Sequence, residues 1–550
     1  MRLDPFTVGI IRDGLVAAAE ESFIRFGRSS QSPIIYEVLD YAAGITDERG
    51  DLVAQANGVP GFLGTLSFAV KAVIEKFGGA GPKPGEGFAP GDLFITNDPY
   101  SGGGNHLSDV ALIQPIFCGR KSGGRSRAGS NGQGPSAKGA RPVAFSVNKA
   151  HWTEVGGMAP GSWTTDSTEI YQEGLQFPVI RLGAGYTPDP ALVDLIAANV
   201  RTPERTLGDL LAGIAALRTA ERRVMEIAAK FGERVVRESM NTILDDGERS
   251  ARAALSSLPR GTFRADELMD DDGLSDEPVR VQAKVTITGD EFVADFTGSS
   301  PQVRGPINCT RTRLHSACRS MFKSVTDPGA PLNDGWFRPL RVVCPDGTVF
   351  TASRPAPVST YWETGAYAVD LIWKALFPVL PGRLTAGHFL SICGIIISGA
   401  DERGERFILV APQAGGVGRG RGQGRGERAC RGGGRRDLHH ARRGVRKQVP
   451  TPRRPVRIRG DRQREGQAPG GIRGREGLQD TLRRGVRDRH LRETQVPPVG
   501  FRRGGGWVPK RSRGVSRREG AWFGMGKLEP MGLGRRGLEG EARALPAAEG

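Results

Sequence analysis

Apolar residues recur at helical spacing in three long stretches of the chain. One face of residues 6–27 consists of Ile11, Leu15, Ala18, Ser22 and Phe26. Gly27 follows this stripe and predicts the end of the helix. Residues 203–231 carry a longer apolar stripe that stops before Gly232, and another helix is predicted over 234–257. Helices of this kind bury their apolar faces, so the pattern predicts a chain with a large core.

Period-two alternation, which is typical of strands, becomes strong in the second half of the chain. Residues 279–287 alternate apolar and polar side chains, and Gly289-Asp290 then turns the chain into 291–296, which predicts a β-hairpin. A second hairpin is predicted for Leu340–Cys344 and Thr348–Thr351 around the turn Pro345-Asp346-Gly347. Shorter buried strands are predicted at 93–95 and 143–147, and the apolar run near 389–400 also fits a buried strand.

Together these elements predict a mixed α+β, multidomain fold. We expect an N-terminal α/β domain over 1–260 and a β-rich domain over 261–410. Residues 119–141 are a polar, glycine-rich stretch, and we expect them to form an exposed, disordered insertion in the first domain.

The net charge of the chain, +17, comes from its last quarter. Residues 411–550 hold 35 Lys and Arg but 13 Asp and Glu, which leaves 42 basic and 47 acidic residues elsewhere. This segment has no periodicity and is rich in Arg and Gly. Reading GC-rich codons out of frame gives such residues, and a frame-shifted translation is our first hypothesis; a disordered basic tail is the alternative. An RNA-binding tail would need more interleaved aromatic residues, so we expect no nucleic-acid partner.

Cysteine usage and apolar patterning favour a cytoplasmic protein. Six scattered cysteines without a C-x-x-C pair do not suggest a disulfide framework. The N-terminal MRLDPFTVGIIRDG lacks the apolar centre of a signal peptide, and the longest apolar run is too short to span a bilayer. The sequence contains no phosphate-binding loop of the G-x-x-x-x-G-K-[ST] type and no G-x-S-x-G motif, and we assign no catalytic residue.

The segment 91–157 holds the candidate chemistry. His106 and His151 lie in glycine-rich turns near three carboxylates, Asp98, Asp109 and Glu154. His106 and Asp109 are three residues apart, so one turn can direct both at a common atom. Two histidines and a carboxylate with an open coordination position suit a divalent metal such as Mn, Fe or Zn. Spacing alone also allows the plain alternative, in which these groups form loop hydrogen bonds and Asp98 belongs to a simple turn.

The chain resembles the hydantoinase B/oxoprolinase family in seven ordered blocks over about 400 residues. These blocks are SPIIYEVLDYAAGITDERGDLVAQ (32–55), GDLFITNDPYSGGGNHLSDV (91–110), AHWTEVGGMAPGS (150–162), EIYQEGLQFP (169–178), NVRTPERTLGDL (199–210), DFTGSSPQVRGPIN (295–308) and PLNDGWFRPLRVVCPDGT (331–348). The resemblance ends at about 411–416, where the Arg/Gly-rich segment replaces the patterned sequence of family members.

This resemblance implies a cytoplasmic subunit that works with a hydantoinase A-type subunit, which binds ATP and activates the substrate. Family members open cyclic amides such as N-methylhydantoin or 5-oxoproline, or carboxylate ketones such as acetone or acetophenone. The acetone-carboxylase-like members hold a metal at positions that match His106, Asp109 and His151, with Mn and Zn as the leading candidates. The resemblance therefore implies an ATP-dependent cyclic-amide hydrolase subunit. The alternatives are a ketone carboxylase subunit and, because of the altered segment 411–550, an inactive product of a damaged gene.

Overall fold

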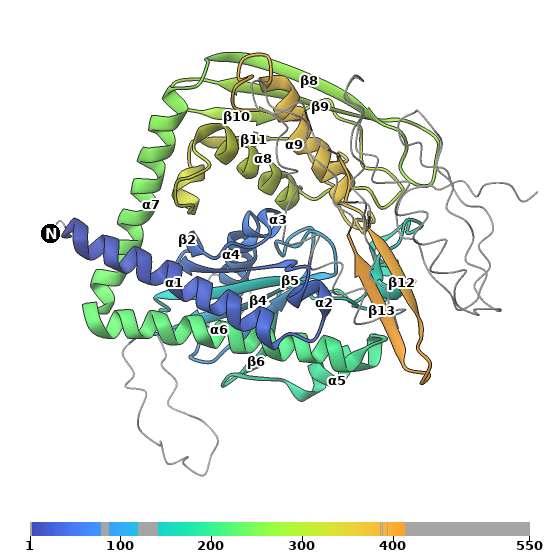
Figure 1. Cartoon of the computed structure of the whole chain (residues 1–550), viewed down its shortest axis with the longest axis horizontal. Helices are drawn as coiled ribbons and strands as arrows, with labels where there is room; N and C mark the ends of the chain where they lie inside the picture. Colours follow the sequence, from blue (N-terminus) through green and yellow to red (C-terminus); the bar gives the residue numbers. More distant parts are fainter. Residues whose placement is uncertain are drawn as a thin grey trace, which may run out of the picture. The chain divides into compact units, whose positions relative to one another are not determined.

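The computed structural model describes residues 3–78, 87–118 and 141–412, apart from positions 385, 386, 388 and 393. These residues all belong to one compact unit of the chain. Within them the fold combines helices with three β-sheets, as Figure 1 shows, and this confirms the predicted mixed α+β class. Most of the expected insertion 119–141 and nearly all of the segment 411–550 lie outside the described residues.

Three of the helices, α1 (Pro5–Ser29), α6 (Pro203–Phe231) and α7 (Glu233–Ser256), follow the predicted apolar stripes closely, and the structure contains others besides. The others are α2 (Pro33–Tyr36), α3 (Pro60–Leu63), α4 (Leu66–Phe77), α5 (Pro190–Asn199), α8 (Arg311–Thr326) and α9 (Trp362–Leu376). Short 3-10 helices are η1 (Pro160–Ser162), η2 (Ile170–Gln172) and η3 (Asp334–Phe337). Asp4 caps α1 by accepting hydrogen bonds from the backbone of Phe6 and Thr7, and proline occupies the first helical turn. Gly232, with φ +89°, separates α6 from α7, as the sequence predicts.

The largest sheet has seven strands in the order β2-β1-β5-β4-β3-β6-β7, and each neighbouring pair is antiparallel. Its strands are β1 (Tyr41–Asp47), β2 (Leu52–Gln55), β3 (Leu93–Thr96), β4 (Asp109–Ile116), β5 (Ala144–His151), β6 (Ile180–Ala184) and β7 (Thr187–Pro188). Helices α1 and α6 cover one face, and α3 and α4 cover the other. Every residue of β4 and β5 is therefore buried, because both faces of these strands are covered.

A second sheet, in the order β11-β10-β9-β8, is formed by residues after 260. Its strands are β8 (Gly261–Met269), β9 (Val279–Ile287), β10 (Phe292–Asp295) and β11 (Leu340–Val343). The alternation in β9 is confirmed: its odd-numbered residues are buried against α8 and α9, and the even-numbered ones are partly or fully exposed. The division into domains 1–260 and 261–410 stays a prediction.

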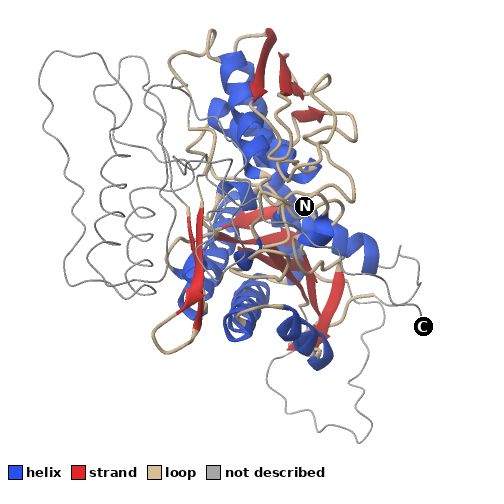
Figure 2. Ribbon diagram, turned by 90° about the vertical axis from the view of Figure 1, so that its right-hand side faces the viewer, coloured by secondary structure: helices blue, strands red, loops and turns tan. Residues whose placement is uncertain are grey.

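A two-stranded antiparallel ribbon, β12 (Ile395–Ala400) with β13 (Arg406–Ala411), completes the described fold. Ile396, Ile408 and Val410 pack into the core that also contains the aromatic residues of the site described below. Figure 2, turned by 90° from the first view, shows this ribbon edge-on beside the helices. Among the described residues no helix is both long enough and apolar enough to cross a bilayer.

Two local predictions from the sequence are wrong. Helix α1 does not end at Gly27 but continues to Ser29, and Gly27 instead gives room to Tyr41, whose hydroxyl oxygen would lie 2.3 Å from an added Cβ. The second hairpin does not form, because β11 pairs in parallel with β10. Residues 348–351 form a turn closed by the hydrogen bond between the hydroxyl groups of Thr348 and Thr351, at 2.8 Å.

Candidate metal centre

Strand register brings two of the predicted residues together. Asp109 is the first residue of β4 and His151 is the last residue of β5, and the antiparallel ladder places them opposite each other. Residues opposite each other in such a ladder have neighbouring side chains on the same face. His106 lies in the turn before β4, and its backbone carbonyl accepts a hydrogen bond from the amide of Asp109 at 3.1 Å. The two histidines therefore meet in the structure, although the stretch 119–141 lies between them in the sequence.

Glycines allow the loop that carries His106 to pack tightly. Gly103 has φ +75°, and a Cβ there would lie 2.5 Å from the backbone nitrogen of Ala69 in α4. An L side chain is disfavoured by both the conformation and the contact. Lys149 also anchors this loop. Its buried ammonium group donates hydrogen bonds to the carbonyl of Gly103 and to the hydroxyl of Thr65, both at 2.6 Å.

Three donor atoms converge at the centre of the site. His106 Nε2 lies 3.0 Å from Asp109 Oδ1 and 3.2 Å from His151 Nδ1, and the last two atoms are 3.4 Å apart. The three residues are at most 2% exposed, and they form a group able to hold a metal ion. A metal with bonds of roughly 2.0–2.2 Å to three cis ligands keeps those ligands about 3–3.5 Å apart. The geometry thus fits a small divalent cation.

Hydrogen bonds from outside the triad fix which atoms face the centre. His106 Nδ1 lies 3.1 Å from the carbonyl oxygen of Ser359, which only accepts, so Nδ1 carries a proton. Nε2 therefore faces the centre, where it can donate to Asp109 or, once deprotonated, offer its lone pair to a metal. Asn105 and Tyr361 donate to Asp109 Oδ2 at 2.9 and 3.2 Å, which leaves Oδ1 for the centre. Such outer partners are the usual supports of metal ligands.

The electrostatics favour a cation among these donors. Burial raises the pKa of Asp109, but the electrostatic and hydrogen-bonding interactions of its carboxylate with His106 and His151 outweigh burial and hold that pKa well below its usual range. Burial lowers the pKa of His151 and favours the neutral imidazole that binds metals. The residues therefore fit a divalent metal, which would satisfy an anionic oxygen and two ring nitrogens together.

Aromatic rings surround the donor set. His106 packs against Tyr361 and Trp362 with ring centroids 5.0 and 5.7 Å apart, and Trp163 lies 5.2 Å from the ring of His151. This apolar wall limits access of water and strengthens electrostatic interactions inside the site.

The other two candidate carboxylates, Asp98 and Glu154, have their hydrogen-bond partners outside the triad. Asp98 accepts hydrogen bonds from the amide of Tyr100 at 3.0 Å and the hydroxyl of Ser101 at 2.6 Å, as a turn residue does. Glu154 is fully buried and binds Arg201 at 2.8 Å, together with the amides of two glycines. Neither carboxylate belongs to the converging group of donors.

The sequence did not single out the supporting residues Asn105, Ser359 and Tyr361, nor Glu173, which accepts hydrogen bonds from the amides of Val358 and Ser359, each at 2.9 Å. Glu173 thereby holds the segment whose carbonyl orients His106. Glu173 lies in one of the seven family blocks, and that was the only signal that could have drawn attention to it.

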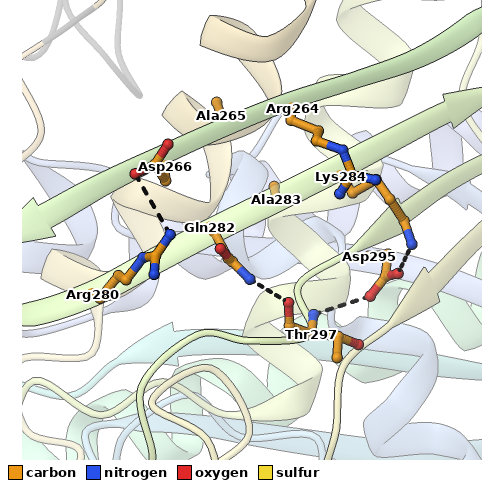
Figure 3. Close-up of a pocket in the computed structure, with 9 residues that line it drawn as sticks. All are labelled: Arg264, Ala265, Asp266, Arg280, Gln282, Ala283, Lys284, Asp295 and Thr297. Carbon is orange, nitrogen blue, oxygen red and sulfur yellow. Dashed lines mark hydrogen bonds and ion pairs between the residues drawn. The ribbon is translucent and has the colours of Figure 1, made fainter.

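A separate pocket lies on the outer face of the second sheet, as Figure 3 shows. Its lining includes Arg280 and Lys284, which form ion pairs with Asp266 at 3.9 Å and Asp295 at 2.6 Å. Both pairs are partly exposed, so they contribute little energy and offer no concentrated charge for a ligand. The pocket does not include His106, Asp109 or His151.

Comparison with known proteins gives a consistent result. The family model for hydantoinase B/oxoprolinase matches residues 4–434, which extends past Gly416, where the resemblance was expected to end. An uncharacterised protein of Methanocaldococcus jannaschii is 32% identical over 72% of this chain and 66% of its own length. The caprolactamase subunit beta of Pseudomonas jessenii is 30% identical over 73% of this chain and 64% of its own.

Two solved structures share the fold. The crystal structure of the ATP-dependent caprolactamase from Pseudomonas jessenii aligns with a TM-score of 0.65 and 28% identity over 74% of this chain and 66% of that chain. A nucleotide-free acetone carboxylase structure aligns with a TM-score of 0.68 and 20% identity over 76% of this chain and 55% of that chain, and shows a likeness of fold. The chain spans just under two thirds of the length of these curated relatives.

Proposed function

The chain belongs to the hydantoinase B/oxoprolinase family, and on this premise we propose that it is the B-type subunit of an ATP-dependent enzyme that hydrolyses a cyclic amide. The observation that carries the proposal is the convergence of His106 Nε2, Asp109 Oδ1 and His151 Nδ1 within 3.0–3.4 Å in a buried, aromatic-walled site. The similarity to a caprolactamase subunit supports a lactam or related ring as the substrate class.

In this proposal the triad holds a divalent metal, with Mn or Zn as the candidates because the donors are two imidazoles and one carboxylate. The ion would polarise the amide carbonyl or lower the pKa of an attacking water. Ser359 and Tyr361 keep the ligands oriented, and the rings of Trp163 and Trp362 limit competing water.

ATP is the second cofactor of the proposed enzyme, and we assign it to an A-type partner subunit. The name subunit beta of the caprolactamase relative supports a hetero-oligomer. Localisation in the cytoplasm belongs to the same proposal, since ATP is available there.

The test is turnover by the full chain purified together with an A-type subunit. Ring opening of caprolactam, 5-oxoproline and N-methylhydantoin would be followed with and without ATP. We expect ATP-dependent turnover that His106→Ala and His151→Ala abolish, while His315→Ala, a histidine of α8 outside the triad, retains it. Activity retained in both triad variants would overturn the assignment of the site.

A ketone carboxylase subunit is the second candidate, because the fold is shared with an acetone carboxylase. The two candidates differ in co-substrate. Consumption of bicarbonate together with acetone or acetophenone, in place of ring opening, would select the carboxylase.

A further inference from the structure

Arg313, in the first turn of α8, has a guanidinium group without a carboxylate partner among the described residues. Its backbone amide donates to Thr310 Oγ1 at 3.3 Å, but its side chain forms no ion pair with any described residue, and its buried Nε atom has no hydrogen-bond partner. A buried donor that is left unsatisfied is costly, and more so when it is charged.

Three other partly buried arginines among the described residues form ion pairs. These pairs are Arg201–Glu154 at 2.8 Å, Arg181–Asp92 at 3.2 Å and Arg319–Asp334 at 3.0 Å. Arg313 differs from these three arginines and shares the lack of an ion pair with Arg205, whose buried Nη1 also has no hydrogen-bond partner.

Two glycines make room for the side chain of Arg313. A Cβ added at Gly365 in α9 would lie 2.8 Å from Arg313 Nε, and one at Gly61 in α3 would lie 3.8 Å from a terminal nitrogen of the same guanidinium. The guanidinium thus occupies a notch where α3, α8 and α9 meet, and any larger residue at position 365 would displace it.

This notch adjoins the metal centre. The guanidinium lies over the ring of Tyr361, 5.9 Å from its centroid, and the hydroxyl of Tyr361 donates to Asp109. The same ring contacts His106 at a centroid distance of 5.0 Å. Thr310, which precedes α8, donates to the carbonyl of Gly104 in the loop that carries His106, at 3.4 Å.

We propose that Arg313 binds an oxyanion, either a carboxylate or a phosphoryl group, on the molecule that reacts at the metal centre. A planar guanidinium offers paired donors that match two oxygens of such a group, and the aromatic ring beneath it keeps the cation oriented. Binding would give the guanidinium, whose buried Nε has no hydrogen-bond partner, a group of opposite charge. This inference deepens the proposed function and rests on it, since the anion would belong to the substrate or to its activated form.

The test is the binding of inorganic phosphate and of acetate to the full chain, measured by calorimetry at constant ionic strength. Wild type is compared with Arg313→Met, Arg313→Lys and the control Arg264→Met, which removes an exposed arginine of β8. Each protein is measured with Mn²⁺ and after treatment with a chelator, and its metal content is determined in parallel.

We expect wild type and Arg264→Met to bind one of the probes equally well, and Arg313→Met to bind it about tenfold or more weakly. Arg313→Lys, which keeps the charge but loses the planar fork, should fall between them, and it decides the question if Arg313→Met fails to fold. Tighter binding of phosphate would identify a phosphoryl group, and tighter binding of acetate a carboxylate. Unchanged binding in the Arg313 variants, or no binding of either probe to wild type at millimolar concentration, would overturn the inference. Full metal content in such samples would leave the proposed function intact.

Discussion

Replacing Gly103 by alanine should weaken both the fold and the metal centre. Gly103 has φ +75°, and its added Cβ would lie 2.5 Å from the backbone nitrogen and 2.9 Å from the Cα of Ala69. These are atoms of α4, which cannot rotate away as a side chain can. Gly347 is a matched control, because it has φ +74° and no atom within 4 Å of its added Cβ.

Both substitutions place an alanine in a left-handed backbone conformation, but only the Cβ added at Gly103 would clash with α4. A left-handed conformation costs an alanine about 1–2 kcal/mol, and the lower entropy of the unfolded chain offsets about 0.4–1 kcal/mol of it. Gly347→Ala should therefore lower the free energy of unfolding by about 1 kcal/mol. Overpacking against α4 should add about 1–3 kcal/mol at Gly103.

Urea unfolding of the metal-loaded full chain measures this difference, and chelator competition measures the metal affinity. We expect Gly103→Ala to weaken metal binding by about tenfold, since outer supports of ligands have effects of this size. Gly347→Ala should leave the affinity unchanged. Equal losses of stability in the two variants, with equal metal affinity, would refute the claim that tight packing of this loop positions His106.

Two further predictions concern the residues around the triad. Burial raises the pKa of Glu173 from its usual 4.5 to about 8, despite hydrogen bonds from Ser167 and two backbone amides. The folded state thus holds a proton that the unfolded state has lost, and this stabilisation is present below pH 4.5 and disappears as the pH rises to about 8. In urea unfolding from pH 5 to 8, wild type should lose stability relative to Glu173→Gln as the pH rises; a constant difference would show that Glu173 is ionised throughout. Tyr361→Phe removes one of the two hydrogen bonds to Asp109 Oδ2. It should weaken metal affinity about tenfold, with little change in the free energy of unfolding. An unchanged affinity in chelator competition would contradict the supporting role of the hydroxyl.

The long helices and the first hairpin could be predicted from the sequence because their signals are local. The stripe of α6 and the alternation of β9 each repeat over many residues, and burial follows both patterns. The partner of β11 could not be predicted in this way. Four residues do not specify whether a strand pairs with its successor along the chain or, as here, in parallel with β10.

The site, too, combines residues with a local signal in the sequence and residues that only the tertiary fold brings together. Two histidines and an aspartate in glycine-rich turns, together with the family resemblance, pointed to the triad, and the register of β4 with β5 brings Asp109 and His151 together. The sequence could not distinguish these groups from the equally polar Glu154, whose carboxylate is occupied by Arg201. Tyr361 lies 252 residues from Asp109, so only the tertiary fold reveals that its hydroxyl donates to that carboxylate.

The most direct test of the account is the metal content of the purified full chain after incubation with Mn²⁺ or Zn²⁺ and removal of free ions. Elemental analysis of wild type should show about one divalent ion per chain. His106→Ala and His151→Ala should lose it, and His315→Ala should retain it, provided that circular dichroism shows all four proteins to be folded. A folded wild type without metal, or both triad variants with full metal content, would contradict the claim that His106, Asp109 and His151 form a metal centre.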